Sequence, residues 1–276
     1  MEAVPRLPMI SFDLKVSPEP TSFGSKLKQY IQDFYHEDAT SYSTEIRNLE
    51  GLRATAVSPV RGATLASCST LKRYYCQLHF LQSRFPMAKD GAAAVPFTWR
   101  DTYANMVCTL ADIRFEMVSI LYNIGAVHSY AGASESRETA DGMKLACTHF
   151  QCAAWAFQHL KDTFPQPSGV DLAPDIMQFM YHLMLAQAQE CILEKSMMDN
   201  RKATIIVIIK GIEELSLTSL LKINNWKRYV KFKIAYHTCV SLLYQGQQAE
   251  EQQKMGERVA FYQAACGEAG GGQQTL

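Results

Sequence analysis

The feature that most constrains the fold is the spacing of apolar residues, which recur every three or four positions along most of the 276-residue chain. This spacing puts them on one face of an α-helix and is sustained over segments of helical length. The clearest stripes predict helices at 27–34, 42–52, 71–84, 113–131, 143–160 and from 176 onward, the last continuing to about Lys210. The sequence therefore predicts a mainly α-helical protein.

Two short stretches have a different period. Residues 8–16 alternate, with Ile10, Phe12, Leu14 and Val16 on one side and Lys15 among the polar residues on the other. A second alternation covers residues 95–99. Because a period of two is typical of half-buried strands, we expect a small antiparallel β-sheet near the N-terminus.

Small residues lie beside aromatic ones in two of the helical segments: Gly125 and Ala126 in the first, Gly256 and Ala260 in the second. Small residues allow neighbouring helices to approach closely, as in tetratricopeptide repeats. No regular 34-residue period is present, so the pattern predicts an irregular, tetratricopeptide-like helical solenoid. Such folds act by presenting an extended face to a partner.

The helical pattern weakens at 210–225, where β-branched residues stand beside Gly211, and the Gly/Gln-rich end from 266 to 276 is typical of a disordered tail. We therefore expect a single domain over residues 1–265, followed by a tail.

Several functional classes are disfavoured by composition. Lys+Arg and Asp+Glu are both 27, so no net charge indicates a nucleic-acid partner. The N-terminus lacks the pattern of a signal peptide, and the most apolar run, 204–209, is too short to span a bilayer. These observations favour a cytoplasmic protein whose eight cysteines are reduced.

Two cysteine patterns resemble known kinds of functional site, but each lacks residues that the site requires. Cys108 and Arg114 have the C-x5-R spacing of tyrosine phosphatases, but the interior lacks glycine and Val107 replaces the usual histidine. In CTHFQC (147–152) only His149 and Cys152 share a helical face, which is too few ligands for zinc. Phosphate-binding glycine loops, GxSxG and HExxH motifs are absent. The sequence predicts no catalytic site, no metal site and no cofactor.

Two helical runs leave alternatives open. Residues 226–233 interleave basic and aromatic residues. The pattern favours an amphipathic helix with Trp226, Tyr229, Val230 and Lys233 on or near one face, and leaves contact with acidic lipid or an acidic peptide as the alternative. Ile205 and Ile209 stack at i,i+4 spacing and are either buried or exposed as a docking stripe.

A family resemblance bears on this choice. The segments QLHFLQSRFPM (77–87), ILYNIGAVHS (120–129), CTHFQCAAWAF (147–157), AQAQECILEKSMMDNRK (186–202) and GQQAEEQQKMGERVAFYQ (246–263) resemble the BRO-type, or Alix-like, domain family. This resemblance implies a helical scaffold that works in endosomal sorting and is recruited from the cytoplasm to endosomes.

The resemblance also implies a partner and a site. The partner is the C-terminal amphipathic helix of an ESCRT-III subunit of the charged multivesicular body protein class, bound at Ile205 and Ile209, with Ile192 and Thr148 as further contacts. Another endosomal adaptor peptide, bound near Thr148, is the alternative. Compared with the family, helices are expected to be missing around 210–225 and after 265, which would impair binding.

Overall fold

The computed structural model describes residues 6–58, 64–164, 169–199 and 224–273, and these divide into two compact units. The first unit contains Ile10–Ala131 and Trp155–Gln178, and the second contains Met1–Met9, Gly132–Ala154 and Phe179–Leu276. Ile205 and Ile209 lie outside the described residues, and so does the 210–225 segment except for its last two residues, which begin a helix.

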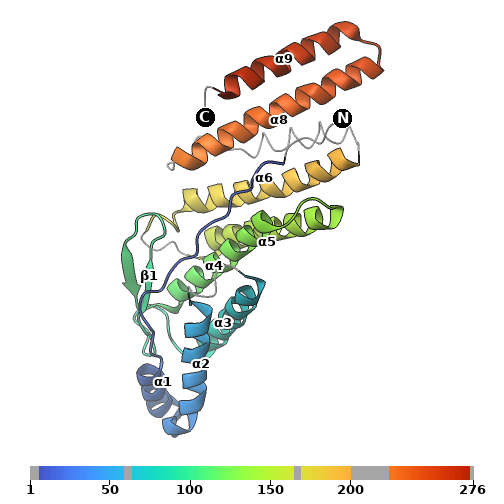
Figure 1. The fold of residues 1–276 in the computed structure, drawn as a ribbon. Helices are drawn as coiled ribbons and strands as arrows, with labels where there is room; N and C mark the ends of the chain where they lie inside the picture. Colours follow the sequence, from blue (N-terminus) through green and yellow to red (C-terminus); the bar gives the residue numbers. More distant parts are fainter. Residues whose placement is uncertain (1–5, 59–63, 165–168, 200–223, 274–276) are drawn as a thin grey trace. The chain divides into compact units, whose positions relative to one another are not determined.

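Helices make up most of the described chain (Figure 1). They are α1 (Gly24–Tyr30), a π-helical turn η1 (Ile31–Tyr35), a 3-10 turn η2 (Ala39–Tyr42), α2 (Ser43–Ala56), α3 (Leu65–Arg84), α4 (Ile113–Ser134), α5 (Ala140–Thr163), α6 (Pro174–Met198), α8 (Asn224–Glu251) and α9 (Met255–Gln273). The predicted mainly α-helical class is confirmed.

The sheet has two antiparallel strands, β1 (Phe97–Arg100) and β2 (Val107–Leu110), which pair Phe97 with Leu110 and Arg100 with Val107. The alternation at 95–99 therefore marks a true strand. The strand expected at 8–16 is absent, because side chains rather than a backbone ladder hold this segment. Ser129 Oγ accepts from the Phe12 amide at 2.9 Å, and Asn123 Oδ1 accepts from the Lys15 amide at 2.7 Å.

The burial of residues 8–16 also differs from the prediction. Phe12 is buried as expected, but Val16 is exposed and Lys15, expected on the wet side, is only 4% exposed. Its ammonium group forms an ion pair with Asp171, which is equally buried. The partner, 156 residues away in the chain, therefore stabilises in the interior a side chain that the alternation predicts to face water.

The core of the first unit surrounds a buried carboxylate, that of Glu116. Arg53 donates to it through Nε at 2.8 Å, Tyr74 through its hydroxyl at 2.9 Å and Trp99 through Nε1 at 2.6 Å. All four side chains are almost completely buried. This network joins α2, α3, β1 and α4 at one point.

Close helix packing occurs at only some of the predicted positions. A Cβ added at Gly125 would lie 3.0 Å from the ring of Phe157, so the prediction holds there, and Ala126 is fully buried. Gly256 and Ala260 are exposed instead, and a Cβ at Gly256 would meet nothing within 4 Å. The close approach between α8 and α9 is at Gly246, which lies against the ring of Tyr262.

The C-terminal segment is a helical hairpin. The pattern over 246–265 does not form one helix, because α8 ends at Glu251 and Gln253 takes a left-handed φ of 60° before α9 begins. The expected disordered tail from 266 is also wrong for the described part, since α9 extends to Gln273. Ala265, just before the predicted tail, is 2% exposed, and its carbonyl accepts from the thiol of Cys239 in α8 at 3.5 Å. This packing holds the middle of α9 against α8.

A candidate docking face on α5 and α6

Two of the four predicted partner-binding residues fall in the described chain. Thr148 is exposed on α5, and Ile192 on α6 keeps 38% of its surface exposed, although it is aliphatic. Both belong to the second unit. The other two, Ile205 and Ile209, are outside the described residues and remain predictions.

The helices α5 and α6 run antiparallel. Lys161, near the end of α5, donates a hydrogen bond to Gln178, near the start of α6. At the opposite ends of the helices, Cys147 lies near Cys191. Burial is the main cause that raises the pKa of the Cys191 thiol, and Cys147 is among the smaller contributions. Cys191 is buried and Cys147 is partly buried in the second unit.

Thr148 comes directly after Cys147 in the chain, and Ile192 comes directly after Cys191. One residue further along an α-helix turns a side chain by about 100°. In an antiparallel pair of helices that face each other at these cysteines, such turns would carry Thr148 and Ile192 to the same side of the pair. Their exposure agrees with this geometry.

We define the docking face as Leu145, Cys147 and Thr148 of α5 with Ile192 of α6. Leu145 is 44% exposed and lies one helical turn from Thr148. Burial raises the pKa of the Cys147 thiol, so this group is neutral at physiological pH. None of these four side chains is charged, but the exposed Lys144, paired with Asp141, lies one turn before Thr148. The sequence analysis missed Leu145, although its i,i+3 spacing from Thr148 was a usable signal.

Ionisable groups on α6 and α8 of the same unit are buried and paired with one another. Lys233 of α8 lies 2.5 Å from Glu190 of α6, and His237 Nε2 lies 3.7 Å from the same carboxylate. Burial alone would raise the pKa of Glu190, but His237 and Lys233 hold it below its usual value. With Val230 buried as well, residues 229–233 form a core-facing helix, which favours the structural interpretation of the basic and aromatic run.

A second buried ion pair lies next to the first. Arg137 Nε is 3.4 Å from Glu194 Oε2, and Arg137 also donates to the Leu7 carbonyl at 2.7 Å. Burial raises the pKa of Glu194 to about 7. These groups hold the N-terminal segment onto the second unit and are too enclosed to contact a large partner.

The phosphatase-like spacing does not form a phosphate-binding loop. Cys108 lies in β2, whereas Arg114 is the second residue of α4. The Arg114 guanidinium forms an ion pair with Asp112, with Nη2 2.7 Å from Oδ2 of the carboxylate. In the described ranges, moreover, no three His, Cys, Asp or Glu side chains are grouped as metal ligands would be.

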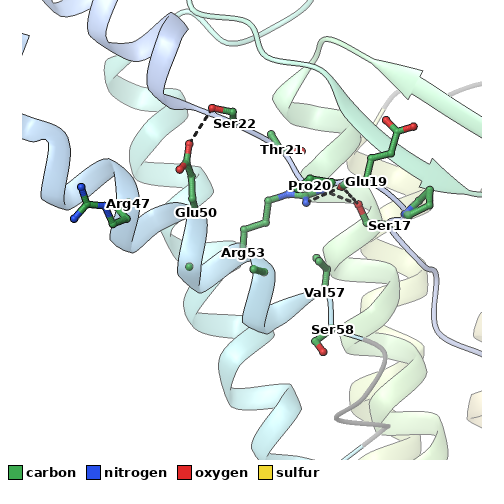
Figure 2. A pocket seen from close by; sticks show the side chains of 13 residues that line it. Ser17, Glu19, Pro20, Thr21, Ser22, Arg47, Glu50, Arg53, Val57 and Ser58 are labelled. Carbon is green, nitrogen blue, oxygen red and sulfur yellow. Dashed lines mark hydrogen bonds between the residues drawn. The ribbon is translucent and has the colours of Figure 1, made fainter.

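A cleft of about 670 Å³ in the first unit has the size of a ligand pocket (Figure 2). It lies between α2 and the extended residues 17–22. Its two central ionisable groups are already engaged: Glu50 accepts from Ser22 and from the backbone amides of residues 23 and 24, and Arg53 binds Ser17 and Glu116. Glu50 and Arg53 therefore serve structural contacts in this cleft.

Mainly helical architecture with exposed aliphatic side chains is typical of a helical binding module. The chain belongs to the BRO1-like domain family, whose family model matches residues 9–274. The resemblance drawn from the sequence segments is thereby confirmed. None of the described helices is long and apolar enough to span a membrane.

Curated relatives are considerably longer. The chain is 44% identical to the human tyrosine-protein phosphatase non-receptor type 23 over 279 residues, which cover 96% of this chain and 17% of the relative. It is 32% identical to the vacuolar protein-sorting protein BRO1 of Gibberella zeae, covering 94% of this chain and 27% of that protein. The chain thus spans well under a third of the length of either.

Solved structures show the same fold. A structure of ALIX with the SIVmac239 PYKEVTEDL late domain superposes with a TM-score of 0.87 at 25% identity, covering 95% of this chain and 41% of that one. The ALIX BRO1–CHMP4C complex superposes with a TM-score of 0.84 at 25% identity, covering 95% and 79%.

Proposed function

We propose that this chain is a non-catalytic adaptor module in endosomal sorting, which binds the C-terminal amphipathic helix of an ESCRT-III subunit on the docking face. The solved relative in complex with CHMP4C supports this choice of partner, and a structure described as the basis for endosomal targeting by the Bro1 domain supports the location. Recruitment to endosomes from the cytoplasm would follow from this binding.

The observation that carries the proposal is the exposure of the aliphatic Ile192 on α6, in the same unit as the exposed Thr148 and Leu145 of α5. Exposed aliphatic groups on a rigid helix are the usual anchors for a partner's amphipathic helix. Ile205 and Ile209 would extend this stripe along the chain after α6. Leucine-type side chains of the partner would pack against it.

The expected affinity is modest. Burial of a few aliphatic side chains at roughly 25 cal/mol/Å² contributes several kcal/mol, and much of this is offset by the lost freedom of the two partners. A dissociation constant on the order of micromolar is therefore expected.

A titration of a synthetic C-terminal helix of a charged multivesicular body protein tests the proposal. Ile192→Asp places a charge where an apolar group must be buried, and it should weaken binding at least about tenfold. Ile205→Asp should do the same. Phe80→Asp is the matched control, since Phe80 is 66% exposed on α3 in the first unit. Equal affinities for the wild type and Ile192→Asp would rule out this face.

The alternative partner, another endosomal adaptor peptide bound near Thr148, is separated by a competition experiment. In one outcome the ESCRT-III helix does not bind, an adaptor peptide does, and Thr148→Asp abolishes the binding of that peptide. The proposed partner class is then wrong, but the proposed docking face is still the binding site.

A further inference from the structure

Two cysteines lie close together where α8 and α9 pack against each other (Figure 1). The Cys239 thiol of α8 donates a hydrogen bond to the carbonyl of Ala265 in α9 at 3.5 Å, and Ala265 immediately precedes Cys266. Burial is the main cause that raises the pKa of the Cys239 thiol, and Cys266 is the next cause, which agrees with this proximity. The hairpin therefore brings together two thiols that are far apart in the chain.

The separation of the two cysteines is close to that of a disulfide. A carbonyl oxygen lies about 3 Å from the Cα atom of the following residue, because the peptide unit is planar and trans. The Cys239 sulfur is therefore within roughly 6.5 Å of the Cα atom of Cys266. Disulfides join residues whose Cα atoms are about 4.4–6.8 Å apart, so a small movement of Cys266 toward α8 closes the bond.

The end of α9 can make this movement. Gly267 directly follows Cys266, and three further glycines stand at 270–272. A Cβ added at Gly267 would meet nothing within 4 Å in the described chain. Glycine is a poor helix former, and helix ends open at little cost in free energy. The last turns of α9 can therefore unwind locally while Tyr262 and the buried Ala265 keep the rest of the helix on α8.

The two thiols differ in their access to solvent. Cys266 is exposed, whereas Cys239 is partly buried and has a raised pKa, which keeps its thiol protonated at physiological pH. An oxidant therefore reaches Cys266 first, and Cys239 is placed to resolve the oxidised sulfur. An exposed cysteine beside a resolving cysteine is the usual arrangement in thiols that respond to peroxide.

We propose that Cys239 and Cys266 form a reversible disulfide in response to hydroperoxides, so that oxidation joins α8 covalently to α9. The Cys266 thiolate attacks the O–O bond of the hydroperoxide and becomes a sulfenic acid, and the peroxide is reduced to an alcohol, or to water in the case of hydrogen peroxide. The Cys239 sulfur then attacks the Cys266 sulfur. The S–S bond forms as the hydroxyl group leaves with the Cys239 proton as water. This step does not depend on the proposed function.

Cys147 and Cys191 supply an internal comparison. They also lie near each other in the second unit, but Cys191 is only 1% exposed and burial raises the pKa of both thiols. Neither thiol should be oxidised while the protein is folded, because an oxidant does not reach the enclosed sulfur. The proposed response therefore requires the exposed Cys266 as well as a second cysteine nearby.

The test treats the folded full chain with hydrogen peroxide and maps its cysteines by mass spectrometry. In the wild type a linked peptide pair containing Cys239 and Cys266 should appear, and dithiothreitol should remove it. In Cys239→Ser, Cys266 should stop at the sulfenic acid, which dimedone traps. In Cys266→Ser, Cys239 should stay reduced. The control Cys147→Ser should give the same linked pair as the wild type.

The bond should also change the stability of the protein. Because it closes a long loop, the Tm of the oxidised wild type should rise by about 5 °C, and reduction should reverse the rise. Absence of the linked Cys239–Cys266 pair from the oxidised wild type would overturn the proposal. A pair that joins Cys147 to Cys191 in its place, or Cys266 to Cys266 of a second molecule, would overturn it as well.

Discussion

Loss of charge at Glu116 should strongly destabilise the first unit. The Glu116 carboxylate is 0% exposed and accepts hydrogen bonds from Arg53, Tyr74 and Trp99. In Glu116→Gln the shape is kept, but the Arg53 guanidinium, with its side chain 2% exposed, loses its counter-charge. The amide also turns an N–H group toward one of the donors.

The magnitude follows from this geometry. Breaking one side of a buried ion pair typically costs about 3–5 kcal/mol, since the remaining charge is buried without compensation. For a chain of this size, this corresponds to a fall in Tm of roughly 6–20 °C. An exposed pair should behave differently: Glu257 lies 3.5 Å from Lys254 with both side chains more than half exposed, and Glu257→Gln should cost less than about 1 kcal/mol.

Urea unfolding followed by tryptophan fluorescence and by far-ultraviolet circular dichroism measures the change. The midpoint for Glu116→Gln should fall well below that of the wild type, with Glu257→Gln as the control. The double variant Arg53→Met/Glu116→Gln removes the stranded charge and should recover at least about 1.5 kcal/mol of the loss. A stability for Glu116→Gln within 1 kcal/mol of the wild type would refute the reasoning.

Three further predictions concern the second unit and the thiols. Gly246→Ala should destabilise the α8–α9 hairpin by about 1–3 kcal/mol in a thermal melt, because the added methyl meets an aromatic ring, whereas Gly256→Ala has open space and should be neutral or slightly stabilising. Burial raises the pKa of Glu194 to about 7, so the folded state binds an extra proton between about pH 4.5 and 7. The stabilising effect of this proton is complete at lower pH and is lost as the pH rises through 7. The free energy of unfolding should therefore depend less on pH in Glu194→Gln than in the wild type. Among the cysteines, the exposed Cys76 and Cys266 should react first with a thiol reagent in the native protein, and equal rates for the buried ones would contradict the burial pattern.

Local patterns predicted much of the fold. The three- and four-residue spacing identified the segments that form α3 to α6, and the alternation at 95–99 identified β1. The resemblance correctly placed the chain in its family. Thr148 and Ile192 were proposed from that resemblance, and both are exposed, although whether they bind a partner is still a prediction.

The errors share one cause. Lys15 was expected in water and is buried against Asp171, while Gly256 was expected at a helix contact that Gly246 makes instead. The helical pattern over 246–265 gave no sign of the turn at Gln253 that separates α8 from α9. In each case the outcome depends on a second segment that the local pattern does not contain.

The sequence by itself determined which segments are helical, because backbone hydrogen bonding and apolar spacing in a helix involve residues three or four positions apart. Only the tertiary structure decided which charges are buried, since Lys15, Arg53 and Lys233 are stabilised by carboxylates distant in the chain. It also decided that both Thr148 on α5 and Ile192 on α6 are exposed. The proposed docking face is therefore a property of the packed pair of helices, to which each helix contributes residues that its own sequence does not bring together.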